Sequence, residues 1–236
     1  MTETKHDEPR QYAARLDVQQ AAAAMQAARL NSIDLLDTAD ILFTLKRFAH
    51  SVAFSILAIE EAGKLTILQA ILCGMEEPAK LWRFYRLHRA KTEGLNLGIM
   101  ARVRATFPEI SLKEAQEIAA RGPTPDDLET AKQRAIYSDC MQRSGQFVCH
   151  LPRNVDWRQE AWDRLCEARA IVLAPRDRSP EELEIWVRYL ATARDSGKSV
   201  AAILPELHKE LVDKGFVEQG WWDTLLKDVD ALSRGV

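Results

Sequence analysis

The amino-acid sequence predicts an all-α protein. Apolar residues recur at the three- and four-residue spacing of helices, and the alternating pattern typical of strands is nearly absent. Residues 111–114 and 179–182 each place a serine three positions before a glutamate, which is the spacing of a capping box at a helix start. We therefore expect a compact bundle of helices that run up and down.

Composition indicates a folded protein without an overall basic field. The chain has 236 residues, of which 47% are apolar and 28% charged, and its formal net charge is -3. These values are ordinary for a globular protein, so any contact with RNA would have to be local. The charged N-terminus lacks the apolar stretch of a secretory signal, which predicts a cytoplasmic location.

The first half of the chain divides into three expected helices. The first covers 17–45 and could be interrupted near Asn31, and the second covers 47–73. Glycine and proline at the ends of 74–78 predict a turn, because glycine permits positive φ and proline cannot continue an interior helix. A third helix is expected from residue 79 into the region of Leu95.

The second half predicts further helices and a boundary between modules. These helices are expected over 111–121, 124–140 and 156–173. Composition turns charged after Ala174, so we expect a bundle over 17–174, a flexible tail over 1–16 and a helical extension over 175–236 packed on the bundle. An apolar helical face after Gly220 could dock on its own domain or bind a partner.

The cysteines predict neither a disulfide framework nor a zinc site, since none has a CxxC neighbour. They are Cys73, Cys140, Cys149 and Cys166. Cys149 precedes His150, but adjacent residues rarely ligate one ion and no second pair follows. We expect four thiols, no bound metal and no cofactor.

A central helix over 49–72 combines an apolar surface with charged residues. It is long enough to cross a bilayer, but Glu60, Glu61 and Lys64 lie near its middle. Each such charge costs about 2.5 to 3.5 kcal/mol on insertion scales, so we expect a buried core helix and no membrane span. Carboxylates in a core need partners.

Two interpretations of these charges remain open. In the structural one, Glu60 pairs with Lys64 at i, i+4 and Glu61 lies near the rim of the bundle. In the functional one, a cationic, aromatic helix over 79–95 faces the carboxylates and turns His88 partly inward. Histidine is the side chain best suited to proton transfer near neutral pH.

Three segments resemble the AbiV family of the HEPN superfamily. Residues 51–64 resemble its alanine-rich helix that ends in Glu-Glu-x-Gly-Lys, and residues 82–91 resemble its aromatic segment that ends in His-x-x-Lys. Residues 132–139 resemble its later Lys-x4-Tyr-x-Asp element. The resemblance covers about 28–173 and implies a HEPN-like helical bundle, with the C-terminal helices as an addition.

The resemblance also implies a function in defence against phage. Members of the superfamily resemble metal-independent endoribonucleases that act as dimers. The resemblance implies that this protein would cleave host or phage RNA and so block translation. His88 would act as general base or acid, Arg83 would stabilise charge on the scissile phosphate, and Glu61 would orient the histidine. On one ideal helix Arg83 and His88 would lie about 140° apart, so a distorted helix or pairing across a dimer would be needed.

Substrate binding is expected from four further residues on the same family elements. They are Lys64, Arg86, Lys91 and Tyr137. The alternative is a non-catalytic defence or regulatory protein that binds a phage or host protein. The low net charge favours this alternative, since a nuclease that grips extended RNA usually carries a broader basic stripe.

Overall fold

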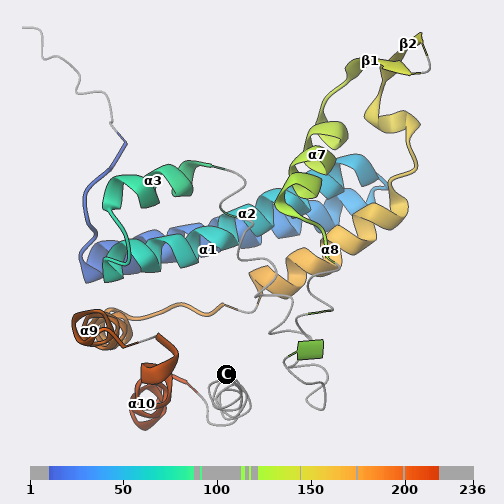
Figure 1. The fold of residues 1–236 in the computed structure, drawn as a ribbon. Coiled ribbons are helices and arrows are strands. Elements are labelled where there is room, and N and C mark those ends of the chain that lie inside the picture. The colour runs from blue at the N-terminus through green and yellow to red at the C-terminus, as the bar shows by residue number, and fades with distance from the viewer. Residues whose placement is uncertain are drawn as a thin grey trace, which may run out of the picture.

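Two long antiparallel helices form the spine of the protein (Figure 1). The computed structural model describes residues 11–87, 91, 113–114, 117, 122–143, 145–173, 175–198 and 200–217. α1 (Val18–Thr44) starts at Asp17, whose side chain accepts a hydrogen bond from the Gln20 backbone in a capping box. It passes Asn31 without interruption and packs along α2 (Phe48–Cys73).

α2 is the central helix, as predicted. It contacts α1, α3, α7, α8 and α9, and its buried residues lie on all sides. It ends at Gly74, whose φ of 63° lies in the left-handed region that glycine adopts without strain. Within the described residues, no helix has both the length and the apolar character of a membrane span.

α3 (Pro78–Arg86) is shorter than predicted. The expected helix into the region of Leu95 is wrong at Leu87, whose φ of -82° and ψ of 126° are extended. The next described residue is Lys91, whose backbone lies against Gly63 of α2. Lys91 is buried at this contact, with 8% of its surface exposed.

A β-hairpin follows α7 and was not predicted. The elements are α7 (Pro125–Ile136), β1 (Asp139–Arg143), β2 (Gln146–His150), a short 3-10 helix (Pro152–Asn154) and α8 (Arg158–Val172). The expected helix to Cys140 is wrong beyond Ile136, because Tyr137 is extended and Gly145, with φ 78°, permits the antiparallel turn. The hairpin projects from the bundle (Figure 1). The other described elements are helices, so the predicted all-α class is confirmed apart from this hairpin.

The C-terminal helices pack on the bundle where α1 starts and α2 ends. α9 (Pro180–Ser196) begins after Ser179, whose hydroxyl accepts from the Glu182 backbone, and α10 (Val200–Asp213) packs on α9. Leu183 of α9 belongs to an apolar cluster, which also contains Met25, Leu68, Ile71, Leu81 and Trp82. The division into modules near residue 174 stays a prediction. The predicted helix at 111–121 is described at isolated positions only. The predicted apolar face after Gly220 lies outside the described residues.

Candidate functional site

The buried carboxylate of α2 is paired with a lysine from α7. Glu60 Oε1 lies 2.5 Å from Lys132 Nζ, and the two side chains are 4% and 5% exposed. Lys132 also lies 2.7 Å from Glu129 Oε2, one turn earlier on α7. Since a charge enters a core only with compensation, this pair anchors α7 to α2 electrostatically as well as by packing.

The second carboxylate of α2 is paired within its own helix. Glu61 forms an ion pair with Lys64 at i, i+3, and both side chains are largely buried. The structural interpretation had paired Lys64 with Glu60, whereas in the structure Lys64 is paired with Glu61, and Glu60 is bound to Lys132 of α7. The Lys64 ammonium also lies 5.0 Å from the centre of the Tyr85 ring, a cation–π contact that reaches α3.

Lys91 approaches the same charges from the chain beyond α3. Burial lowers the pKa of its ammonium, repulsion from Lys64 lowers it further, and attraction to Glu60 and Glu61 opposes both. The Lys91 backbone packs so closely on α2 that a Cβ added to Gly63 would lie 1.8 Å from the Lys91 carbonyl oxygen. Only glycine fits at position 63 with the backbone in this place.

These five residues form what we call the charged cluster. It comprises Glu60, Glu61, Lys64, Lys91 and Lys132. Its members come from three segments that are far apart along the chain, and each segment is one of the elements that resemble AbiV. The fold thus brings the three elements together around the middle of α2.

Only some of the predicted site residues lie in the charged cluster. Glu61, Lys64 and Lys91 meet in the charged cluster. Arg83 and Arg86 are exposed on α3, and in the part of the chain that the structure describes no ion pair joins either of them to the cluster. Tyr137 is 57% exposed just beyond α7. His88 lies outside the described residues.

Two cluster residues, Glu60 and Lys132, and the contact at Gly63 were not predicted from the sequence. Glu60 was considered only as a structural partner of Lys64, and Lys132 only as the first residue of a family element. Their pairing joins positions 72 residues apart, which no local spacing reveals. The signal for Gly63 was present, since a glycine in the middle of a buried helix often marks close backbone approach.

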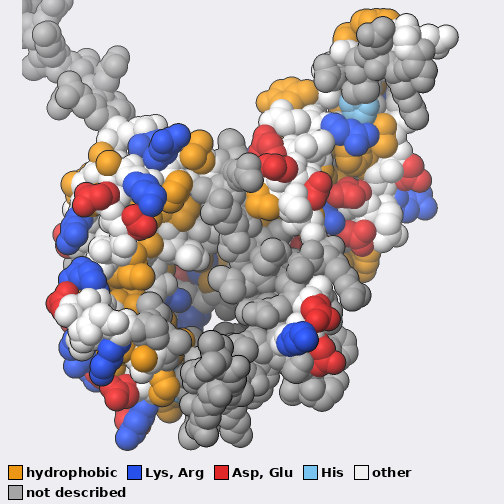
Figure 2. Space-filling view, in the orientation of Figure 1, with side chains coloured by type: hydrophobic (Ala, Val, Ile, Leu, Met, Phe, Trp, Pro, Cys, Tyr) orange, Lys and Arg blue, Asp and Glu red, His pale blue; other side chains and the backbone are white. Residues whose placement is uncertain are grey.

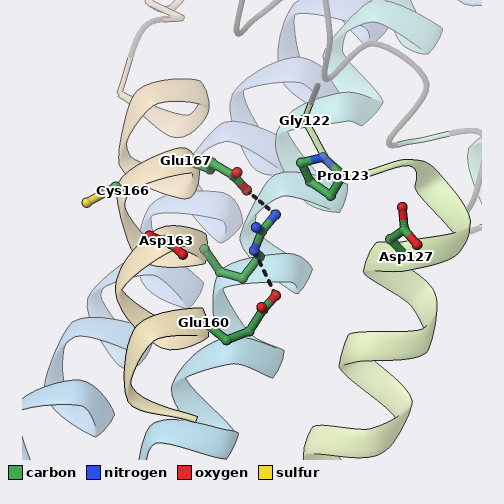
Figure 3. A pocket seen from close by; sticks show the side chains of 8 residues that line it. Gly122, Pro123, Asp127, Glu160, Asp163, Cys166 and Glu167 are labelled. Atoms are coloured by element: carbon green, nitrogen blue, oxygen red, sulfur yellow. Dashed lines mark hydrogen bonds and ion pairs between the residues drawn. The ribbon is translucent and has the colours of Figure 1, made fainter. Parts of the chain in front are cut away.

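A second polar site lies between the start of α7 and α8 (Figure 3). This acidic pocket has a volume of about 560 Å³, and it is lined by Gly122, Pro123, Asp127, Glu160, Asp163, Arg164, Cys166 and Glu167. Arg164 Nε lies 3.1 Å from Glu160 Oε1, and its Nη1 lies 2.5 Å from Glu167 Oε2. Burial raises the pKa of Glu167 to about 7, although Arg164 opposes this.

No three histidine, cysteine, aspartate or glutamate side chains gather as a metal site among the described residues. The expectation of metal-independent chemistry stays a prediction. On the face drawn in Figure 2, acidic and basic side chains are intermingled over the described helices.

The fold and the charged cluster define a helical-bundle protein with ionised groups at its core. The AbiV family model, one of the HEPN models, matches residues 20–173. This match covers more than half of the chain and takes in the whole charged cluster, so the chain belongs to the AbiV family of abortive-infection defence proteins. No curated protein and no solved structure matches the chain.

Proposed function

We propose that this member of the AbiV family is a metal-independent endoribonuclease that cleaves host or phage RNA and so blocks translation. The convergence of three family elements in the charged cluster is the observation that supports the proposal. Lys91 ends the element that contains Arg83 and His88, and its backbone is fitted against Gly63. The cluster therefore fixes one end of the segment that would carry the catalytic groups.

The cluster residues have different roles in this proposal, according to their burial. Glu60 and Lys132 are too deeply buried to touch RNA, so they act as positioning residues that hold α7 on α2. Lys64 and Glu61 retain a little exposure, at 16% and 15% of their side chains, and could orient a group at the edge of the cluster. Lys91 adds positive potential beside them.

The exposed cations and the histidine supply the chemistry. Arg83 and Arg86 present guanidinium groups to solvent on α3, where they can bind a phosphate. Position 88 lies three steps along the chain from Lys91, a distance of at most roughly 11 Å. His88 would take the proton of the RNA 2′-hydroxyl or give one to the leaving oxygen, while Arg83 stabilises the charge that develops on the phosphate.

The direct test is cleavage of RNA by purified variants in the presence of a chelator. We expect His88→Ala to lose at least about a hundredfold in rate, which is the lower range for removal of a general acid or base. Wild-type products should carry the 2′,3′-cyclic phosphate that attack by the 2′-hydroxyl leaves. The control is His50→Ala, because His50 is an exposed histidine of α2 and should not affect cleavage. Equal cleavage by the His88 variant and the wild type would refute the proposal.

A homodimer is part of the same proposal. Arg83 and His88 of one copy could meet those of a second copy in a shared groove, which would overcome their separation within one chain. Mixing an inactive His88→Ala chain with an inactive Arg83→Ala chain tests this idea. Recovery of cleavage in the mixture is expected if the two copies contribute to one site, and no recovery is expected if each copy acts alone.

The alternative is a non-catalytic defence protein that binds a phage or host protein. The burial of Glu60 and Lys132 favours it, because a fully buried ion pair can serve the fold alone. The net charge of -3 also lacks the basic bias of a protein that grips long RNA. Intact phage protection in a His88→Ala strain, with protection lost in surface variants, would establish this alternative.

A further inference from the structure

Two cysteines face each other across the hairpin. β1 and β2 are antiparallel, and their register places Cys140 directly opposite Cys149. The two Sγ atoms lie 3.7 Å apart, and both residues are exposed. Opposed residues of antiparallel strands have Cα atoms about 4.5 to 5.5 Å apart, which falls within the range of about 4.4 to 6.8 Å found in disulfides. The backbone therefore needs little change to accept a disulfide here.

We propose that Cys140 and Cys149 are a site of reversible oxidation, at which a small cellular disulfide such as glutathione disulfide converts the two thiols into a cross-strand disulfide. The thiolate of one cysteine attacks the small disulfide, which forms a mixed disulfide and releases one small thiol. The second cysteine then attacks the protein sulfur of that mixed disulfide and releases the second small thiol. Two protein thiols are oxidised and one small disulfide is reduced to two thiols.

The other two cysteines lack this arrangement. Cys73 is buried at the end of α2, where burial raises the pKa of its thiol to about 11 and so keeps it in the unreactive protonated form. Cys166 is half-buried on α8, where it lines the acidic pocket and does not lie opposite another cysteine. Oxidation should therefore be selective for the hairpin.

The hairpin is connected to the charged cluster through α7. His150, which follows Cys149, has its Nε2 3.0 Å from the backbone oxygen of Arg134, and Arg134 lies two residues after Lys132. A disulfide would fix the two strands in register beside this contact. The redox state of the hairpin is thus positioned to affect the order at the end of α7, whether or not the protein cleaves RNA.

The test is thiol chemistry on the reduced full-length protein. The protein is equilibrated in glutathione buffers of increasing oxidised fraction, trapped by alkylation and analysed by peptide mass spectrometry. We expect two thiols to disappear together, with one linked peptide pair that contains Cys140 and Cys149. The matched control Cys166→Ser should behave as the wild type, whereas Cys140→Ser and Cys149→Ser should abolish the linked pair.

Three results would overturn the proposal. They are mixed disulfides with glutathione that persist at both positions, a link between two chains in place of one within a chain, and oxidation at Cys166 before the hairpin. Circular dichroism of the two hairpin variants confirms that they are folded, since both side chains are exposed. Amide hydrogen exchange adds a second readout, because the linked hairpin should exchange more slowly than the reduced one.

Discussion

The charged cluster and the acidic pocket are both polar sites within the bundle, but their charges are balanced differently. In the charged cluster, each carboxylate of α2 is bound to a lysine, and burial lowers the pKa of the third lysine, Lys91. The acidic pocket is lined by four carboxylates and one arginine, which pairs with two of them, and burial raises the pKa of Glu167 to about 7. Burial disfavours the charged form in both sites, so it lowers the pKa of a lysine in the charged cluster and raises the pKa of a carboxyl group in the acidic pocket.

The largest expected effect is loss of the buried pair in the charged cluster. Lys132→Met should lower the free energy of unfolding by about 3 to 5 kcal/mol, because it removes the lysine partner of a carboxylate that stays buried. Urea unfolding measures this loss. The control is Lys80→Met, whose pair with Glu76 is half-exposed and should contribute less than about 1 kcal/mol.

A double variant sharpens this test. If the loss comes from the charge left on Glu60, then adding Glu60→Met to Lys132→Met should restore part of the stability, since buried ion pairs are often replaced by apolar groups without loss. A double variant less stable than Lys132→Met alone would contradict the electrostatic explanation.

The acidic pocket should make stability depend on pH. The folded protein holds the Glu167 proton with a pKa of about 7, above the ordinary value of 4.5, so the folded state binds this proton more tightly. The resulting stabilisation is present in full below about pH 4.5 and is lost as pH rises through about 7. Its size is at most about 3 kcal/mol. Glu167→Gln should flatten this part of the stability profile, whereas the exposed Glu76→Gln should leave it unchanged.

Gly63→Ala tests the contact that holds Lys91. Alanine usually stabilises a helix relative to glycine, by about 1 kcal/mol. Here the added Cβ would meet the Lys91 carbonyl oxygen, so we expect a loss of about 1 to 3 kcal/mol instead. Thermal unfolding gives the sign directly. Thr66→Ala, at an exposed position of the same helix, should change stability by less than about 0.5 kcal/mol.

The smallest expected effect concerns the aromatic edge of the cluster. Tyr85→Leu removes the ring that lies over the Lys64 ammonium and should cost about 1 kcal/mol in chemical denaturation. Tyr85→Phe keeps the ring and should cost less than half as much. Equal losses in the two variants would show that the hydroxyl, and not the ring, is the important group.

Much of the fold could be predicted because the signals are local. The cap at Asp17, the left-handed Gly74 and the cap at Ser179 each mark a helix end in the sequence itself. The end of α3 at Arg86 could not be predicted in this way, because no glycine or proline marks it in the sequence.

The charged cluster was also predictable in part. Glu61, Lys64 and Lys91 were identified because they stand in recognisable elements, whereas the partnership of Glu60 with Lys132 needs the packing of α7 on α2. The prediction of four thiols is confirmed, but the sequence did not reveal that two of them lie side by side. CxxC spacing detects thiols brought together within one loop, but Cys140 and Cys149 are joined by strand pairing across nine positions.

The position of Leu183 has a consequence for how the protein can be divided. The family match ends at residue 173, yet this leucine of α9 is fully buried against the apolar cluster that includes Trp82 of α3. A gene shortened after residue 173 would encode a chain that lacks Leu183 and so exposes the apolar cluster around Trp82 to water. Such a fragment would be prone to self-association, so the family-matched residues and the C-terminal helices should be expressed together.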